Sequence, residues 1–118
     1  MRIRRLLARW FRPLPFDVCP DCRGATRDHE VRTLARERFS PSVSGIEGHL
    51  ARGEFAQAAA LDEPDTLGDQ LVHHVVRCRD RVIVVTVAEP VGFDLDPRIR
   101  ATLVLDGSDA EAAWSCAR

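Results

Sequence analysis

Hydrophobic and polar residues follow two different patterns along this chain. Up to about residue 61, apolar residues spaced by three and four, together with residues that favour helix starts, indicate helices. Between residues 71 and 105, short runs rich in Val and Ile are separated by turn residues, which is typical of β-strands. The pattern predicts an α+β domain in which N-terminal helices precede a three-stranded antiparallel meander and a short C-terminal helix.

The segment over residues 2–12 is predicted to be an amphipathic helix, with an apolar stripe on one face, Arg residues on the other, and Pro13 at its end. Such a helix suits docking to a protein partner or packing on its own domain. Its aromatic residues beside an Arg face also suit a nucleic-acid backbone or an anionic membrane surface, but eleven residues are few for stable membrane binding, so peripheral membrane contact is not expected. The chain therefore divides into a basic amphipathic helix with a Pro-rich connector over 1–16 and a single α+β domain over 17–118. The residues predicted to bind a partner are Arg2, Arg5, Arg9, Trp10 and Arg12.

Two further helices are expected before the strands. One is predicted over residues 28–39, although residues 31–35 also alternate as they would in a strand. A capping box of the form Ser-x-x-Glu at residues 44–47 predicts another helix that runs to about Leu61. Gly53 lies inside that segment and indicates a turn between two short helices or a bend.

The strands of the meander are predicted over residues 71–78, 81–88 and 99–105. The first two are separated by Arg79-Asp80 and read as a hairpin, although this pair is not a favoured two-residue turn. A second capping box at residues 108–111 predicts the start of the C-terminal helix.

The composition indicates one small globular domain. The chain has 118 residues, of which 45% are hydrophobic and 30% charged. Lys, Tyr and Asn are absent while Arg, Ala and Val are abundant, which predicts a bacterium with a GC-rich genome. Residues 1–38 hold ten Arg and five acidic residues, whereas residues 39–118 hold seven Arg and thirteen acidic residues. This asymmetry argues against nucleic-acid binding by the whole surface and leaves the N-terminal segment as its candidate site.

The cellular compartment is predicted from what the sequence does not contain. No apolar run approaches the roughly 18 residues that a membrane span needs. The N-terminus has positive charge but neither a continuous apolar core nor a small-residue cleavage site, so no signal peptide is expected. We therefore expect a cytoplasmic protein without a transmembrane segment. In that reducing setting the four cysteines are expected to be thiols or metal ligands rather than disulfides.

The strongest chemical signal is Cys19-Pro20-Asp21-Cys22, with Gly24 two residues later. Two thiolates three residues apart on a tight turn suit zinc, and the glycine would let the chain reverse with positive φ. Locally this segment resembles one half of a zinc-ribbon or rubredoxin-type site, which implies a single metal ion. A ribbon would need a second CxxC, and the chain has none.

The remaining ligands must therefore come from isolated residues. His29, seven residues after Cys22, is the most economical candidate. On a strand over 71–78, His74 and Cys78 would share a face but lie about 13 Å apart, so at most one of them is expected to join the site. His73 would point to the opposite face. The candidate metal ligands are Cys19, Cys22, His29, Cys78 and His74, with one zinc ion as the predicted cofactor.

No constellation of catalytic residues is evident, so we expect a zinc-stabilised accessory or binding protein that acts on a protein partner, as an inhibitor or immunity-type protein would. One alternative is a thiol-disulfide oxidoreductase, because Cys-Pro-x-Cys resembles the active-site motif of glutaredoxins. The residues before Cys19 are too short and proline-broken for the strand that such a fold needs. The other alternative is a nucleic-acid-associated protein that binds through its Arg-rich N-terminal helix.

Overall fold

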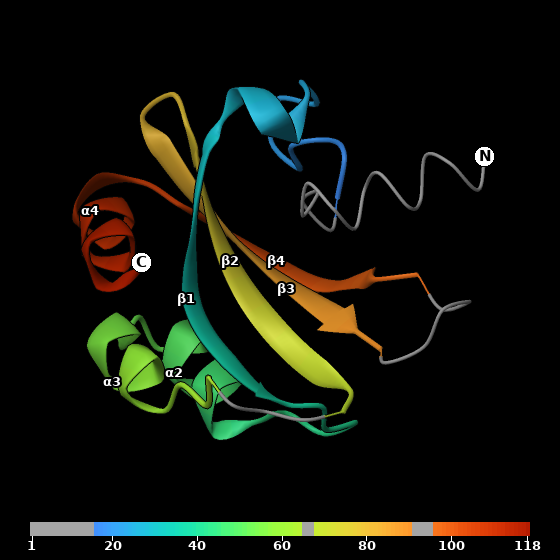
Figure 1. Cartoon of the computed structure of the whole chain (residues 1–118). Coiled ribbons are helices and arrows are strands. Elements are labelled where there is room, and N and C mark those ends of the chain that lie inside the picture. The colour runs from blue at the N-terminus through green and yellow to red at the C-terminus, as the bar shows by residue number, and fades with distance from the viewer. Residues whose placement is uncertain (1–15, 65–67, 91–95) are drawn as a thin grey trace.

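A four-stranded antiparallel sheet organises the described part of the chain, which in this computed structural model comprises residues 16–64, 68–90 and 96–118 (Figure 1). Its order follows the sequence, so each strand pairs with the next. The strands are β1 (Glu30–Arg38), β2 (Gln70–Cys78), β3 (Arg81–Glu89) and β4 (Arg98–Leu105). The helices are the short 3-10 helix η1 (Thr26–Asp28) and the α-helices α2 (Gly45–Ala51), α3 (Phe55–Ala60) and α4 (Gly107–Cys116).

The α+β class is confirmed, but the prediction of three strands and of a helix over 28–39 is wrong. That segment is the edge strand β1, which pairs with β2 along its length. A β-bulge between Thr33 and Ala35 shifts the register, and both Leu34 and Ala35 are buried in the core under the helices. Val31, by contrast, packs against the opposite face. The apparent helical spacing of these apolar residues therefore comes from a bulge that places two neighbours on one side.

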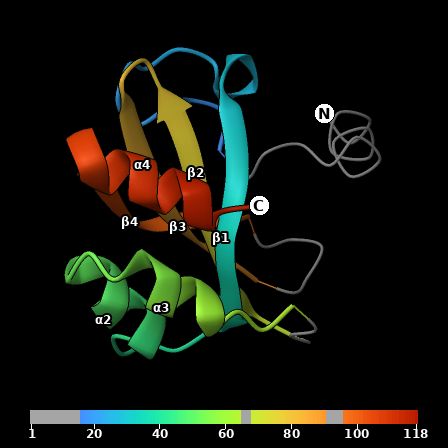
Figure 2. The ribbon, with the colours of Figure 1, turned by 90° about the vertical axis from the view of Figure 1, so that its left-hand side faces the viewer.

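The two faces of the sheet have different coverings. The α-helices lie on one face, as the two views of the ribbon show (Figures 1 and 2). There the core includes Leu34 of β1, Val84 of β3 and Trp114 of α4. On the other face, Phe16 and Cys19 pack against apolar residues of β2 and β3. Alternation within β2 and β3 supplies both cores, which is why these two central strands read as continuous Val- and Ile-rich runs.

Turn and cap geometry follows the sequence in part. Ser44 caps α2, its hydroxyl oxygen accepting the backbone N–H of Glu47 at 3.1 Å, and the predicted turn between two short helices occurs at Gly53, with φ of +73°. The hairpin at Arg79-Asp80 is also present, with Arg79 at φ +59°. The second capping box is wrong: α4 begins at Gly107 after Asp106 and has no side-chain cap.

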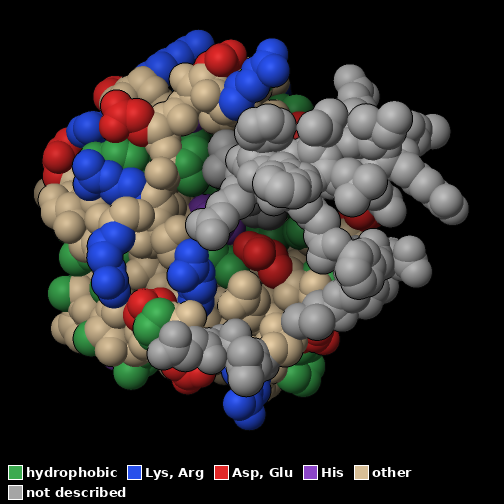
Figure 3. Space-filling view, viewed as in Figure 1, with side chains coloured by type: hydrophobic (Ala, Val, Ile, Leu, Met, Phe, Trp, Pro, Cys, Tyr) green, Lys and Arg blue, Asp and Glu red, His purple; other side chains and the backbone are tan. Residues whose placement is uncertain are grey.

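Charge is mixed on the face of the molecule that Figure 3 presents. In its described part, Arg side chains are interspersed with Asp and Glu rather than gathered into one field. Among the described residues, none of the helices is both long and apolar enough to cross a membrane.

Candidate metal centre

Residues 19–24, which we call the knuckle, form a tight turn beside the sheet. The N–H of Cys19 donates to the carbonyl of Gly24 at 2.8 Å, and the N–H of Arg23 donates to the carbonyl of Cys19 at 3.0 Å. A single bridge between Val18 and Ala25 closes its base. Arg23 takes the left-handed conformation, with φ of +66°, so the turn reverses at this residue.

Gly24 has another role than the one expected from the sequence, because its φ is not positive. Its backbone N–H donates to Sγ of Cys22 at 3.3 Å. A Cβ at this position would lie 3.3 Å from the same sulfur. Glycine is therefore favoured here because it lets the backbone approach a thiolate closely.

Cys78 reaches the knuckle from the last position of β2, far along the sequence. Its register partner Arg81 and the tight turn at Arg79 fix where this strand ends. Cys78 belongs to the same apolar cluster as Cys19 and is almost fully buried, with 2% of its surface exposed. The predicted hairpin thus delivers a third sulfur to the first two.

His29 lies between η1 and β1, and its ring is oriented by the backbone of Ala25. Its Nδ1 lies 2.9 Å from the carbonyl oxygen of Ala25. Because a carbonyl can only accept, Nδ1 carries the proton of the neutral ring and Nε2 keeps a free lone pair. Nε2 faces Sγ of Cys22 at 3.2 Å. Metal-binding imidazoles usually donate their other N–H to a carbonyl or carboxylate, so the orientation of this ring is compatible with metal binding through Nε2.

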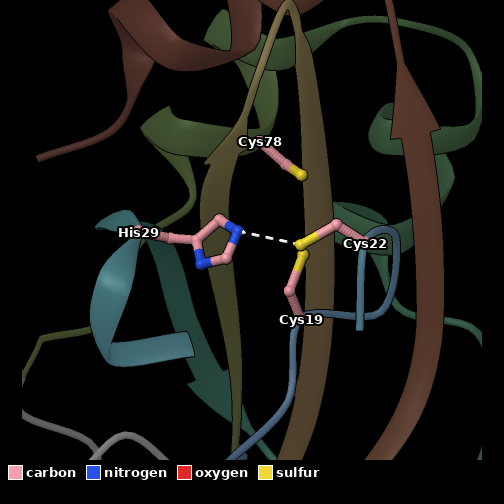
Figure 4. Close-up of side chains that lie close together, drawn as sticks. All are labelled: Cys19, Cys22, His29 and Cys78. Carbon is pink, nitrogen blue, oxygen red and sulfur yellow. Dashed lines mark hydrogen bonds between the residues drawn. The ribbon is translucent and has the colours of Figure 1, made fainter. Parts of the chain in front are cut away.

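The four ligand atoms converge on one point (Figure 4). Sγ of Cys19, Cys22 and Cys78 and the near nitrogen of His29 all lie within 4.8 Å of one another. A tetrahedral zinc ion with bonds of about 2.3 Å to sulfur and 2.0 Å to nitrogen would hold such atoms roughly 3.5–3.8 Å apart. The group could therefore bind a metal ion after small side-chain movements, and its Cys₃His donor set is one that zinc favours.

The side chains of the cluster differ in the direction in which their pKa values are shifted. The hydrogen bond from the Gly24 amide lowers the pKa of Cys22 from 9.0 to about 7. Burial raises the pKa of Cys78 to about 12, and neighbouring sulfurs add to that rise. The carbonyl of Ala25 raises the pKa of His29. A metal ion would therefore meet Cys22 partly as thiolate and would have to displace a proton from Cys78.

His74, which competed with Cys78 for the site, does not join the cluster. Its Nε2 lies 3.3 Å from a carboxylate oxygen of Glu89, and its ring packs edge-on against Phe16 at 5.9 Å. His74 and Cys78 lie on the same face of β2, as predicted, and only Cys78 is near the knuckle. His74 is also buried.

His73 points to the opposite face of β2, as expected, and is completely buried. Its Nε2 donates to Oε2 of Glu37 at 2.6 Å, and its Nδ1 lies 2.8 Å from the hydroxyl of Thr86. The hydroxyl of Ser44 donates to the same oxygen of Glu37 at 2.9 Å. Sequence reasoning missed Glu37, because only the β1–β2 register brings it beside His73.

The predicted partner-binding residues all lie outside the described residues. They are Arg2, Arg5, Arg9, Trp10 and Arg12. The remaining cysteine, Cys116, lies in α4 and packs partly against the core under the helices, away from the knuckle. Within the described ranges, the metal-binding candidates therefore reduce to Cys19, Cys22, His29 and Cys78.

Comparison of the chain with protein-family models, with curated proteins and with solved structures finds no match. What the site can do therefore follows from its own geometry and chemistry.

Proposed function

We propose that this protein binds one structural zinc ion through Cys19, Cys22, His29 and Cys78, and that the zinc-stabilised domain acts by binding a protein partner. The convergence of four ligand atoms within 4.8 Å carries the metal assignment. Zinc is the ion of choice because three thiolates and one imidazole are soft ligands that suit tetrahedral coordination.

A structural rather than a catalytic ion is favoured by the number of ligands. Catalytic zinc sites keep a position open for water or substrate, whereas four protein ligands close the coordination sphere. Three of the four come from the segment before β1, and the fourth comes from the hairpin at the end of β2. The ion would therefore tie the N-terminal segment to the sheet, adding stability where the segment has only a short turn of its own.

A thiol-disulfide oxidoreductase receives less support from the same geometry. Such enzymes expose the first cysteine of the motif at a helix N-terminus. Here Cys19 is completely buried and the knuckle is followed by η1, a helix of one turn. Cys22 is the more exposed thiol, in the second position of the motif. The buried first cysteine therefore favours binding of an ion over attack on a substrate.

A protein partner is proposed from charge and from the closed site together. Residues 39–118 hold thirteen acidic residues against seven Arg, so a partner with a basic surface is the kind that this body would attract. Titration of the purified protein against candidate basic proteins tests this part. Binding that depended on Arg2, Arg5, Arg9 and Arg12 alone would contradict a contact through the acidic body and would favour the N-terminal residues predicted from the sequence instead.

Elemental analysis of the untagged protein tests the metal assignment. We expect one zinc ion per chain in the wild type, a loss of most zinc in Cys19→Ser and in Cys78→Ser, and full retention in Cys116→Ser, the matched control outside the cluster. Absence of metal from wild-type protein purified with zinc present would refute the assignment, as would equal zinc contents in wild type and Cys19→Ser.

A further inference from the structure

The two edge strands of the sheet, β1 and β4, differ in the contacts that their outer sides make. On β1, the backbone of Arg118 exchanges two hydrogen bonds with that of Thr33, at 2.7 and 2.8 Å, and a carboxylate oxygen of Asp62 accepts the N–H of Arg36 at 2.7 Å. These contacts cover that edge. On the opposite side, β4 ends the sheet, and no further strand pairs with it among the described residues. Uncovered edges are templates for pairing with another chain.

The uncovered edge carries exposed apolar residues, and its exposed charge, Arg98, stands at the first position of the strand. Ile99 is 46% exposed and Val104 is 51% exposed, on the face opposite the helices. Between them, Ala101 and Thr102 are exposed and Leu103 is half-buried. The intervening Arg100 is turned aside, because its guanidinium donates to the carbonyls of Ser40 and Ser42. Arg100, whose charge could otherwise hinder pairing in the middle of β4, is therefore directed away from the edge.

Pairing with β3 shows how these residues are spaced. Ile83, Val85 and Val87, at equal steps along β3, pair with Val104, Thr102 and Ile99. The register shift next to Arg100 absorbs the additional residue, so Ile99 and Val104 lie at equal distances on either side of Thr102. The edge is thus symmetric about Thr102 in the property that matters for pairing: apolar at both ends on one face.

We propose that β4 pairs antiparallel with β4 of a second copy of this chain, about a two-fold axis through Thr102. In this register Thr102 lies opposite Thr102 of the second copy, Ile99 lies opposite Val104, and Ala101 lies opposite Leu103. A two-fold interface requires this reciprocity, in which residue i contacts j and j contacts i. Both half-exposed apolar residues are covered by it, and no like charges face each other in these positions.

The area of one strand pair is small. A stable protein interface typically buries about 1,600 Å², more than a short ribbon of two strands supplies. We therefore expect a dimer in equilibrium with the monomer, which sedimentation velocity or light scattering would detect as a mass that rises with concentration. A monomer throughout about a hundredfold concentration range, up to the solubility limit, would overturn the proposal.

A pair of charge variants tests the two-fold register. Thr102→Lys and Thr102→Glu each place like charges opposite each other at the axis, so each alone is expected to be monomeric. Mixed in equal amounts they are expected to form a heterodimer, because the opposite charges then face each other. Circular dichroism checks that both variants fold, which the exposed position favours. Dimerisation of either variant alone, or a mixture that stays monomeric, would overturn the register.

A second pair of variants tests the edge independently of the axis. Val104→Arg, at a 51% exposed position of β4, is expected to abolish the dimer. Leu61→Arg, at a 46% exposed position after α3, is its control and should leave the dimer unchanged. A dimer that survived Val104→Arg, or that Leu61→Arg removed equally well, would place the contact elsewhere.

Discussion

Glu37→Ala is the substitution whose cost can be worked out most directly from the structure. The carboxylate accepts two side-chain hydrogen bonds, from Nε2 of His73 at 2.6 Å and from the hydroxyl of Ser44 at 2.9 Å. Ser44 is only partly buried and can turn to water, but His73 is completely buried. A change of tautomer does not help, because Nδ1 would then donate to Thr86 and Nε2 would become an unpaired acceptor.

One buried polar atom without a partner costs about 1–3 kcal/mol of unfolding free energy. We therefore expect Glu37→Ala to destabilise the protein by that amount, measured by urea unfolding at constant zinc concentration. Glu37→Gln keeps an acceptor oxygen and should lose less. Glu111→Ala removes an exposed ion pair to Arg77, 3.4 Å long, and should cost less than about 1 kcal/mol. A loss in Glu37→Ala no larger than that in Glu111→Ala would refute the reasoning.

Three further predictions concern His73 and the knuckle. Burial lowers the pKa of His73 below 6.5, so the folded state favours the neutral ring. Its contribution to the unfolding free energy is fully present above about pH 6.5 and declines as the pH falls, by at most about 1.4 kcal/mol per pH unit. Urea unfolding at several pH values should show a smaller decline in His73→Gln. Gly24→Ala crowds Sγ of Cys22 at 3.3 Å and should weaken zinc binding in a chelator competition. Gly45→Ala, whose Cβ would make only an ordinary 3.5 Å contact with Leu61, should not, and equal affinities of the two variants would contradict the close approach. In metal-free protein, iodoacetamide should alkylate Cys22, with a pKa of about 7, well before Cys78, with a pKa of about 12, as followed by mass spectrometry. Zinc should protect both thiols. Equal alkylation rates would contradict the hydrogen bond from Gly24 to Cys22.

The sequence predicted the meander well because its signal is local. Val- and Ile-rich runs and short turns place β2, β3 and β4 within a residue or two of their observed ends. β1 was missed because a bulge at Leu34 is set by pairing with β2 and not by local propensity. A strand with a bulge can match helical spacing over a few residues, so only the tertiary contact distinguishes the two.

The candidate site shows the same division between local and distant information. The knuckle and His29 are close in sequence, and their spacing was enough to predict them as a group. Cys78 was an open choice against His74, because choosing between them requires knowing which end of β2 meets the knuckle. The close approach of Gly24 to a sulfur could not be predicted either, since it depends on Arg23 and not Gly24 adopting positive φ.

Strand periodicity explains why a single cysteine in the sheet can complete the cluster. Side chains along β2 alternate between the helix-covered face and the opposite face, so Cys78 faces the knuckle while its neighbour Arg77 reaches Trp114 of α4 on the other side. A register shift of one residue would move the thiol to the wrong face and leave three ligands. The turn that ends β2 prevents such a shift, because Cys78 and Arg81 pair directly and Arg79 adopts the left-handed conformation between them. The hairpin therefore fixes the position of the distant sulfur in this candidate metal centre, which is the part that a second CxxC would play in a zinc ribbon.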